Sequence, residues 1–226
     1  MPLLISHPLH RSAPLYPGTP PVSISEVKSI TKSDSSNTSL ITFSSHSGTH
    51  IDLPRHFCPN GSSVTDILSP ETLYAPVFCI DLPIKGDQPI TPDDLKEPLS
   101  KIDGIKNAAA LLIRTGAFRL LATSPDLYAS VHPWAHPALP AYLRELCPQL
   151  QVFGLDTISI ATPLHREEGR AAHRAFLCGE HPILLLEDLD LSSEKLLNGA
   201  FTLRLYPIVY DDLDGVPVIA VAEIKI

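Results

Sequence analysis

Runs of apolar residues recur along the chain and are separated by segments rich in proline and polar residues. Residues 77–82, 108–114 and 182–189 are apolar over most of their length, which is typical of strands buried on both faces. Residues 91–95 begin with threonine, proline and two aspartates, the usual start of a helix. This helix lies between the first two strands, so the order strand, helix, strand predicts an α/β core.

Other segments alternate between apolar and polar positions. Residues 22–25 and 40–43 do so on either side of a polar connection, which predicts a hairpin leading into residue 45. We interpret the acidic residues 211–215 as a solvated turn rather than a calcium loop, because they lack the ligand spacing of one. The other predicted elements are strands over residues 3–5, 152–157, 201–207 and 216–222, and helices over residues 140–146 and 167–177.

The segment 45–56 holds three histidines and an aspartate. Its even-numbered positions, His46 to His56, share one face of an extended chain, and Ile51 and Leu53 would face a core. A helix would have to tolerate Gly48 and a proline, so the pattern favours strand or loop. In a straight strand the first histidine and the aspartate would lie about 20 Å apart. A shared metal ion therefore requires a bend, which Gly48 can accommodate.

Imidazole nitrogens and a carboxylate oxygen suit zinc, manganese or iron. Three such side chains leave a coordination position open for water, which is the requirement for catalysis. Burying or exposing four polar groups together has no evident benefit for folding, so a purely structural role is the weaker interpretation.

The motif His46-x-Gly48-Thr49-His50-x-Asp52-x-Pro54-x-His56 resembles the signature of the cyclase family, which includes bacterial kynurenine formamidases and isatin hydrolases. The resemblance implies that His46, His50 and Asp52 bind a metal and that His56 is the catalytic acid/base. It extends to a later helix and strand, whose His173 and Glu187 would complete the metal site. It also implies an α/β fold of the swivelling β/β/α type, with a central barrel-like mixed β-sheet flanked by helices, in one domain over residues 1–226.

Several assignments stay open at this point. The alternatives for the second half of the site are Glu180, His181, His165 and Asp188, with Asp188 the nearest substitute for Glu187. Asp156 could orient a ligating histidine or cap a turn. The structural interpretation is preferred for the remaining candidates, which are Cys58 as a ligand, His7 and His10 as substrate contacts, and Trp134 on a loop facing a substrate or a partner subunit.

Composition limits the kinds of binding partner and the cellular compartment that we expect. The chain of 226 residues carries a formal charge of −8 without a basic stripe, which argues against nucleic acid. It has no apolar run near 18 residues and no signal-peptide pattern at its start, so we expect a cytoplasmic protein that does not enter the membrane. The four cysteines are far apart in sequence, which predicts reduced thiols rather than a disulfide framework. The family resemblance implies a homodimer or a larger homo-oligomer.

These observations lead to one main hypothesis and two alternatives. The main hypothesis is a hydrolase of a small amide, similar to kynurenine formamidase or arylformamidase, that uses one or two divalent ions, Zn²⁺ first and Mn²⁺ second. An isatin hydrolase-like or other cyclic-amide hydrolase would use the same residues. A metal-binding protein without turnover is the alternative from another class. Motifs for a nucleophilic serine, a dinucleotide or a phosphate loop are absent from the sequence.

Overall fold

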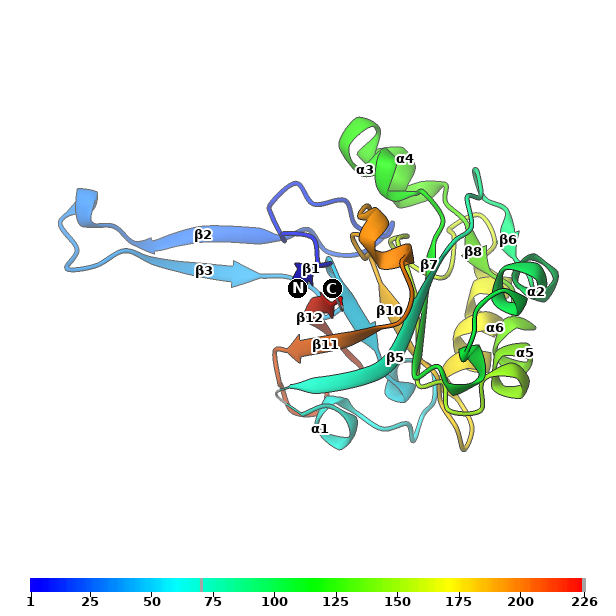
Figure 1. Cartoon of the computed structure of the whole chain (residues 1–226). Helices are drawn as coiled ribbons and strands as arrows, with labels where there is room; N and C mark the ends of the chain where they lie inside the picture. The colour runs from blue at the N-terminus through cyan, green and yellow to red at the C-terminus, as the bar shows by residue number, and fades with distance from the viewer. Residues whose placement is uncertain (70, 225–226) are drawn as a thin grey trace.

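The computed structural model describes residues 1–69 and 71–224, in which strands form a closed barrel and helices pack around it (Figure 1). The strands are β1 (Pro2–Leu4), β2 (Ser23–Lys28), β3 (Thr38–Thr42), β4 (His50–Asp52), β5 (Thr72–Asp81), β6 (Pro89–Ile90), β7 (Ala110–Arg114), β8 (Trp134–Ala135), β9 (Val152–Leu155), β10 (Leu184–Glu187), β11 (Phe201–Pro207) and β12 (Gly215–Glu223). The α-helices are α1 (Val64–Ile67), α2 (Pro92–Ser100), α3 (Phe118–Thr123), α4 (Pro125–Ser130), α5 (Leu139–Leu146) and α6 (Arg166–Leu177). The 3-10 turns are η1 (Ile30–Lys32), η2 (Pro54–His56), η3 (Ile105–Asn107) and η4 (Glu194–Leu197).

Seven strands form the barrel in the order β12, β11, β5, β7, β9, β10 and β4, and β4 pairs back onto β12 to close it. β1 extends the sheet along β12. The neighbours from β5 through β7 and β9 to β10 run parallel, and the other barrel pairs run antiparallel. This arrangement confirms the α/β class and the barrel-like mixed sheet flanked by helices.

The continuous apolar runs are explained by burial of both faces of the parallel strands. In β5, Val77 and Cys79 belong to the cluster that fills the barrel, whereas Phe78 and Ile80 pack in a second cluster with residues of α2, α5 and α6. Figure 1 shows these three helices together on one side of the barrel. The second cluster therefore holds the helices in place, and among them α6 is the one that reaches the candidate site.

A second feature is the hairpin of β2 and β3, which extends away from the barrel (Figure 1) and confirms the hairpin predicted from the alternating pattern. Ile24 pairs with Ile41 across it. Val27, Leu40 and Ile41 are each more than half exposed. Its ends lie near Thr19 and Ser44, two residues that line the cavity described below.

Two local predictions are corrected. The strand-like face does not continue through His56, because Pro54–His56 forms a 3-10 turn, as the restricted dihedral of the proline favours. Trp134 lies in a strand and not on a loop, and its burial agrees with the preferred packing interpretation. The residue is in the short strand β8, only 5% exposed, and its Nε1–H donates to the Asp87 carbonyl at 2.6 Å. In the described part of the chain, no helix has the length and apolar character needed to cross a bilayer.

Candidate metal centre

The first part of the site lies on β4. Ile51 and Leu53 point into the barrel core, so His50 and Asp52 point outward. The chain bends before β4 at Gly48, whose φ is +67°. This bend returns His46 to the strand, where its Nδ1 lies 2.7 Å from Asp52 Oδ1. The predicted bend at Gly48 is therefore present.

The second part comes from β10 and α6. In the ladder between β4 and β10, Glu187 lies opposite His50, and the two side chains approach to 3.3 Å between His50 Nε2 and Glu187 Oε2. From α6, His173 Nε2 lies 3.6 Å from both Asp52 Oδ2 and Glu187 Oε1. The structure thus brings His46, His50, Asp52, His173 and Glu187 together, and we call these five residues the His/carboxylate cluster.

Each of the two buried histidines of the cluster, His50 and His173, donates a hydrogen bond from Nδ1. Nδ1 of His50 is 2.8 Å from the Gly48 carbonyl oxygen, and Nδ1 of His173 is 2.8 Å from the Gly169 carbonyl oxygen. Because a carbonyl only accepts, each Nδ1 donates, which leaves Nε2 as the ring nitrogen that faces the carboxylates. Glu187 Oε1 accepts from the Ile160 amide at 2.7 Å and from the Ser159 hydroxyl at 3.0 Å. Such outer contacts are typical of residues that orient metal ligands.

The spacing of the cluster fits a cation. Ligand atoms about 2.0–2.2 Å from one ion lie about 3.0–3.6 Å from each other in tetrahedral or octahedral geometry. The distances from His50 Nε2 to Asp52 Oδ1 and to Glu187 Oε2 are both 3.3 Å. The corresponding side chains are only 1–4% exposed, and burying two carboxylates against one imidazole requires compensating positive charge.

A residue that the sequence did not predict joins the site. Asp214 Oδ2 lies 3.0 Å from His46 Nε2 and 2.8 Å from His56 Nδ1. The predicted solvated turn is thus wrong for this residue. Gly215 permits the approach, because a Cβ there would lie 2.5 Å from His46 Cε1. The only signal in the sequence is an acid placed directly before a glycine and an apolar strand.

The cluster opens into a cavity of about 330 Å³. His46, His50, Asp52, His173 and Glu187 line it together with His56. Its other walls comprise apolar side chains, among them Phe57, Ile158 and Ala161, and a polar group formed by Tyr16, Arg166 and Arg170. This volume lies at the lower end of the range for small-molecule sites.

A family model described as putative cyclase matches residues 3–162 of the sequence. The chain belongs to the cyclase family. This membership confirms the resemblance recognised in the His46–His56 motif.

Three similar proteins extend the comparison for this cyclase-family chain. The kynurenine formamidase of Bacillus cereus (strain ATCC 10987 / NRS 248) is 31% identical over 217 residues, covering 96% of this chain and 94% of that protein. Isatin hydrolase A from Labrenzia aggregata, solved bound to benzyl benzoate, superposes with a TM-score of 0.80 at 20% identity, covering 100% of this chain and 94% of that chain. A structure described as a potential metal-dependent hydrolase with cyclase activity superposes with a TM-score of 0.72 at 19% identity, with coverage of 100% and 98%.

The charge balance of this cyclase-family site is reflected in its pKa values. Burial alone would lower the pKa of His46, but Asp52 and Asp214 raise it to about 9. Burial and the Asp52 charge raise the pKa of Glu187, yet His173 and His50 outweigh them and lower it to about 2. The carboxylates therefore stay ionised and gather positive charge. Protons and a divalent ion compete for the same atoms, so metal affinity is expected to fall at acidic pH.

The rival residues lie elsewhere. His165 Nε2 is 3.3 Å from Asp87 Oδ2, and Glu180 and His181 are exposed beyond the end of α6. Asp188 accepts a hydrogen bond from the buried Tyr128 hydroxyl.

Asp156 accepts hydrogen bonds from the Thr115 and Gly116 amides at 2.7 and 2.9 Å, so it caps the turn after β7 and does not orient a histidine. His7 and His10 are not among the residues that line the cavity.

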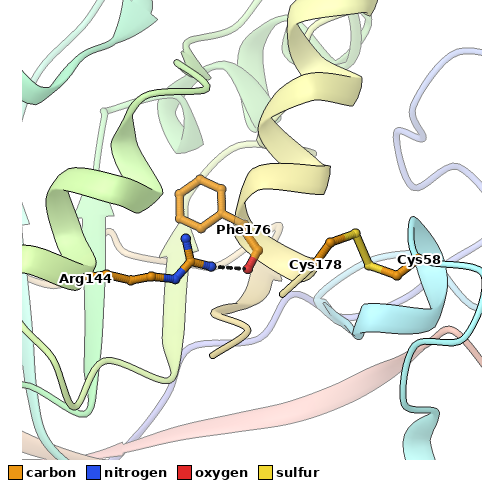
Figure 2. Close-up of a disulfide and its surroundings, with 4 residues drawn as sticks. All are labelled: Cys58, Arg144, Phe176 and Cys178. Carbon is orange, nitrogen blue, oxygen red and sulfur yellow. Dashed lines mark hydrogen bonds between the residues drawn. A yellow bond between two sulfur atoms is a disulfide. The ribbon is translucent and has the colours of Figure 1, made fainter. Parts of the chain in front are cut away.

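A disulfide joins Cys58 and Cys178, which contradicts the predicted reduced state of these two thiols and rules out Cys58 as a metal ligand in this form (Figure 2). They are 120 residues apart in sequence, and only the packing of α6 beside η2 brings them together. Cys79 and Cys147 are free and buried. The disulfide joins the segment that carries His56 and Phe57 to the end of α6. Earlier in the same helix, the His173 ring stacks on the Phe57 ring with 4.5 Å between the ring centroids.

We expect the Cys58→Ser/Cys178→Ser double variant to lose about 2–4 kcal/mol of unfolding free energy, because the unfolded chain regains the freedom of a long loop. Chemical denaturation under non-reducing conditions measures this change. A reductant should destabilise the wild type and leave the double variant unaffected. Equal stability of both proteins without reductant would contradict the prediction.

Proposed function

We propose that this cyclase-family protein is a metal-dependent hydrolase that cleaves the C–N bond of a small amide. The observation that carries the proposal is that the His/carboxylate cluster lines a cavity together with His56, whose ring centroid lies 4.1 Å from that of His46. A protein that only stores or senses a metal needs neither the cavity nor a further histidine outside the ligand set. The enzyme is therefore favoured over the metal-binding alternative.

In this proposal His46, His50 and Asp52 bind one divalent ion. His173 and Glu187 would hold a second ion together with Asp52, whose two oxygens face different histidines. Zn²⁺ is the first candidate and Mn²⁺ the second, because both accept nitrogen and oxygen ligands. A bound ion would supply a water whose pKa is lowered from about 15.7 towards 7 and would polarise the substrate carbonyl.

His56 has the position expected of the acid/base. It lines the cavity, and its side chain is 26% exposed, so it can exchange protons with substrate and solvent. Nδ1 of His56 contacts the Asp214 carboxylate at 2.8 Å, so Nδ1 carries a hydrogen and Nε2 is left free for proton transfer. In the proposed reaction His56 Nε2 takes a proton from the attacking water and passes it to the leaving nitrogen, and Asp214 holds the ring in place.

The substrate is proposed to be an aryl formamide or a cyclic amide. The names of the relatives point to formylkynurenine and to isatin, and both compounds are small enough for the cavity. The cytoplasmic location and the homo-oligomer stay predictions. An interface between copies could bury the exposed apolar side chains of the β2–β3 hairpin, and light scattering would test it.

A panel of small amides, with N-formylkynurenine and isatin first, tests the proposed function. We expect chelator-sensitive release of the amine or ring-opened product from at least one of them, because the cluster has no role in hydrolysis without its ion. Adding Zn²⁺ or Mn²⁺ after the chelator should restore turnover. Turnover that is unchanged by chelation would contradict a metal-dependent reaction.

A further inference from the structure

Two arginines at the wall of the cavity have no part in the proposed hydrolysis. Arg166 and Arg170 both line the cavity, and both belong to α6, the helix that carries His173. They precede His173 by seven and three residues, so the three side chains share one side of the helix. With a rise of about 1.5 Å per residue, the Cα atoms of Arg166 and Arg170 lie about 10.5 and about 4.5 Å from the Cα atom of His173 along the helix axis.

The charge of these arginines is largely uncompensated. Arg170 Nη1 lies 2.7 Å from Glu167 Oε1, in an exposed pair whose carboxylate is 79% accessible to solvent. Within residues 1–69 and 71–224, no ion pair joins Arg166 to a carboxylate. The cluster carboxylates Asp52 and Glu187 are balanced by the neighbouring histidines of the cluster. The arginines thus leave one end of the cavity positive.

Tyr16 adds a neutral donor at the same place. It lines the cavity and packs with Ile158, and burial raises the pKa of its phenol despite the opposing field of Arg166. Its hydroxyl therefore keeps its proton at neutral pH. A hydroxyl donor and two guanidinium groups that line one cavity form a set that suits a carboxylate, which accepts several hydrogen bonds at once.

We propose that Arg166 and Arg170 form a carboxylate-binding subsite that selects amides carrying a carboxylate group several bonds away from the scissile bond. This inference rests on the proposed function, because it places the scissile amide at the His/carboxylate cluster. The apolar wall between the two ends, with Phe57 and Ile158, would contact the body of the substrate. The spacing along α6 sets the distance between the two ends.

The test compares N-formylkynurenine with its carboxylate methyl ester, in which a small neutral ester replaces the negative carboxylate. For the wild type we expect a higher kcat/KM for the acid than for the ester, because the acid has the lower KM. In Arg166→Gln/Arg170→Gln this preference should fall at least 10-fold. Arg174→Gln is the matched control, because Arg174 is exposed on the same helix but does not line the cavity, and it should keep the wild-type preference. A preference that is unchanged in the double variant would overturn the subsite.

Binding measurements separate this inference from the proposed function. Calorimetry on the metal-loaded protein with the product kynurenine and its methyl ester reports the subsite even if no amide is hydrolysed. Tighter binding of the acid, lost in the double variant, supports the subsite whether or not turnover is seen. Equal binding of acid and ester by the wild type contradicts it, even if amide hydrolysis is established.

Discussion

Replacing His56 with alanine is expected to lower kcat by about 10²–10⁴-fold, the usual contribution of a positioned acid/base, while the bound metal is retained. The reason is geometric. His56 contacts Asp214 and lines the cavity, whereas the closest approaches inside the cluster join Asp52 and Glu187 to His46, His50 and His173. Removing His56 therefore removes a proton donor and leaves those contacts in place. Steady-state kinetics with elemental analysis of the same preparation measures both effects.

His10→Ala is the control for this variant, because His10 is exposed and, among the described residues, its ring forms a hydrogen bond only with the Ser12 hydroxyl. It should retain wild-type activity. If His56→Ala loses the metal, the residue is a ligand rather than the acid/base. Full activity in His56→Ala would mean that it has no role.

The second large effect is expected for Asp52→Asn. Asp52 is only 1% exposed, and its Oδ1 lies 2.7 Å from His46 Nδ1 and 3.3 Å from His50 Nε2. Its Oδ2 faces His173. The amide keeps the shape but removes the charge at the centre of the cluster, so we expect metal affinity to fall by more than the roughly 10–100-fold seen when outer partners of ligands are changed. Turnover should be lost with the metal.

Asp188→Asn provides a buried comparison. Burial raises the pKa of Asp188, and the Tyr128 hydroxyl can donate to an amide oxygen as well as to a carboxylate. This variant should bind metal as the wild type does, as judged by titration with a chelator of known affinity. An Asp52→Asn protein that holds metal as tightly as Asp188→Asn would show that the cluster is not the binding site.

Much of the fold follows from local patterns. The apolar runs of β5, β7 and β10 predict strands buried on both faces, and the Thr91-Pro92-Asp93-Asp94 start predicts α2, where the Thr91 amide donates to Asp94 Oδ2 at 2.8 Å. The first half of the site is equally local. His46, His50 and Asp52 lie within one short segment, and Gly48 shows where it bends. The family resemblance supplied His173 and Glu187, which periodicity alone does not assign.

The unpredicted features all depend on long-range pairing. Asp214 reaches His46 and His56 because Gly215 pairs with Asp52 across the closed barrel, and no local pattern specifies that register. Cys58 and Cys178 meet because α6 ends beside η2. Composition predicts a solvated turn for the acid run and reduced thiols for the cysteines, because it describes exposure on average. It does not specify the neighbours of a particular residue.

Elemental analysis of protein purified without added metal, paired with activity before and after chelation, tests the central claim most directly. We predict at least one divalent ion per chain, lost together with amide hydrolysis on chelation and restored together with it when the ion is returned. A chain that is free of metal, binds none when Zn²⁺ or Mn²⁺ is supplied, and still hydrolyses the amide would contradict a catalytic metal centre at the His/carboxylate cluster.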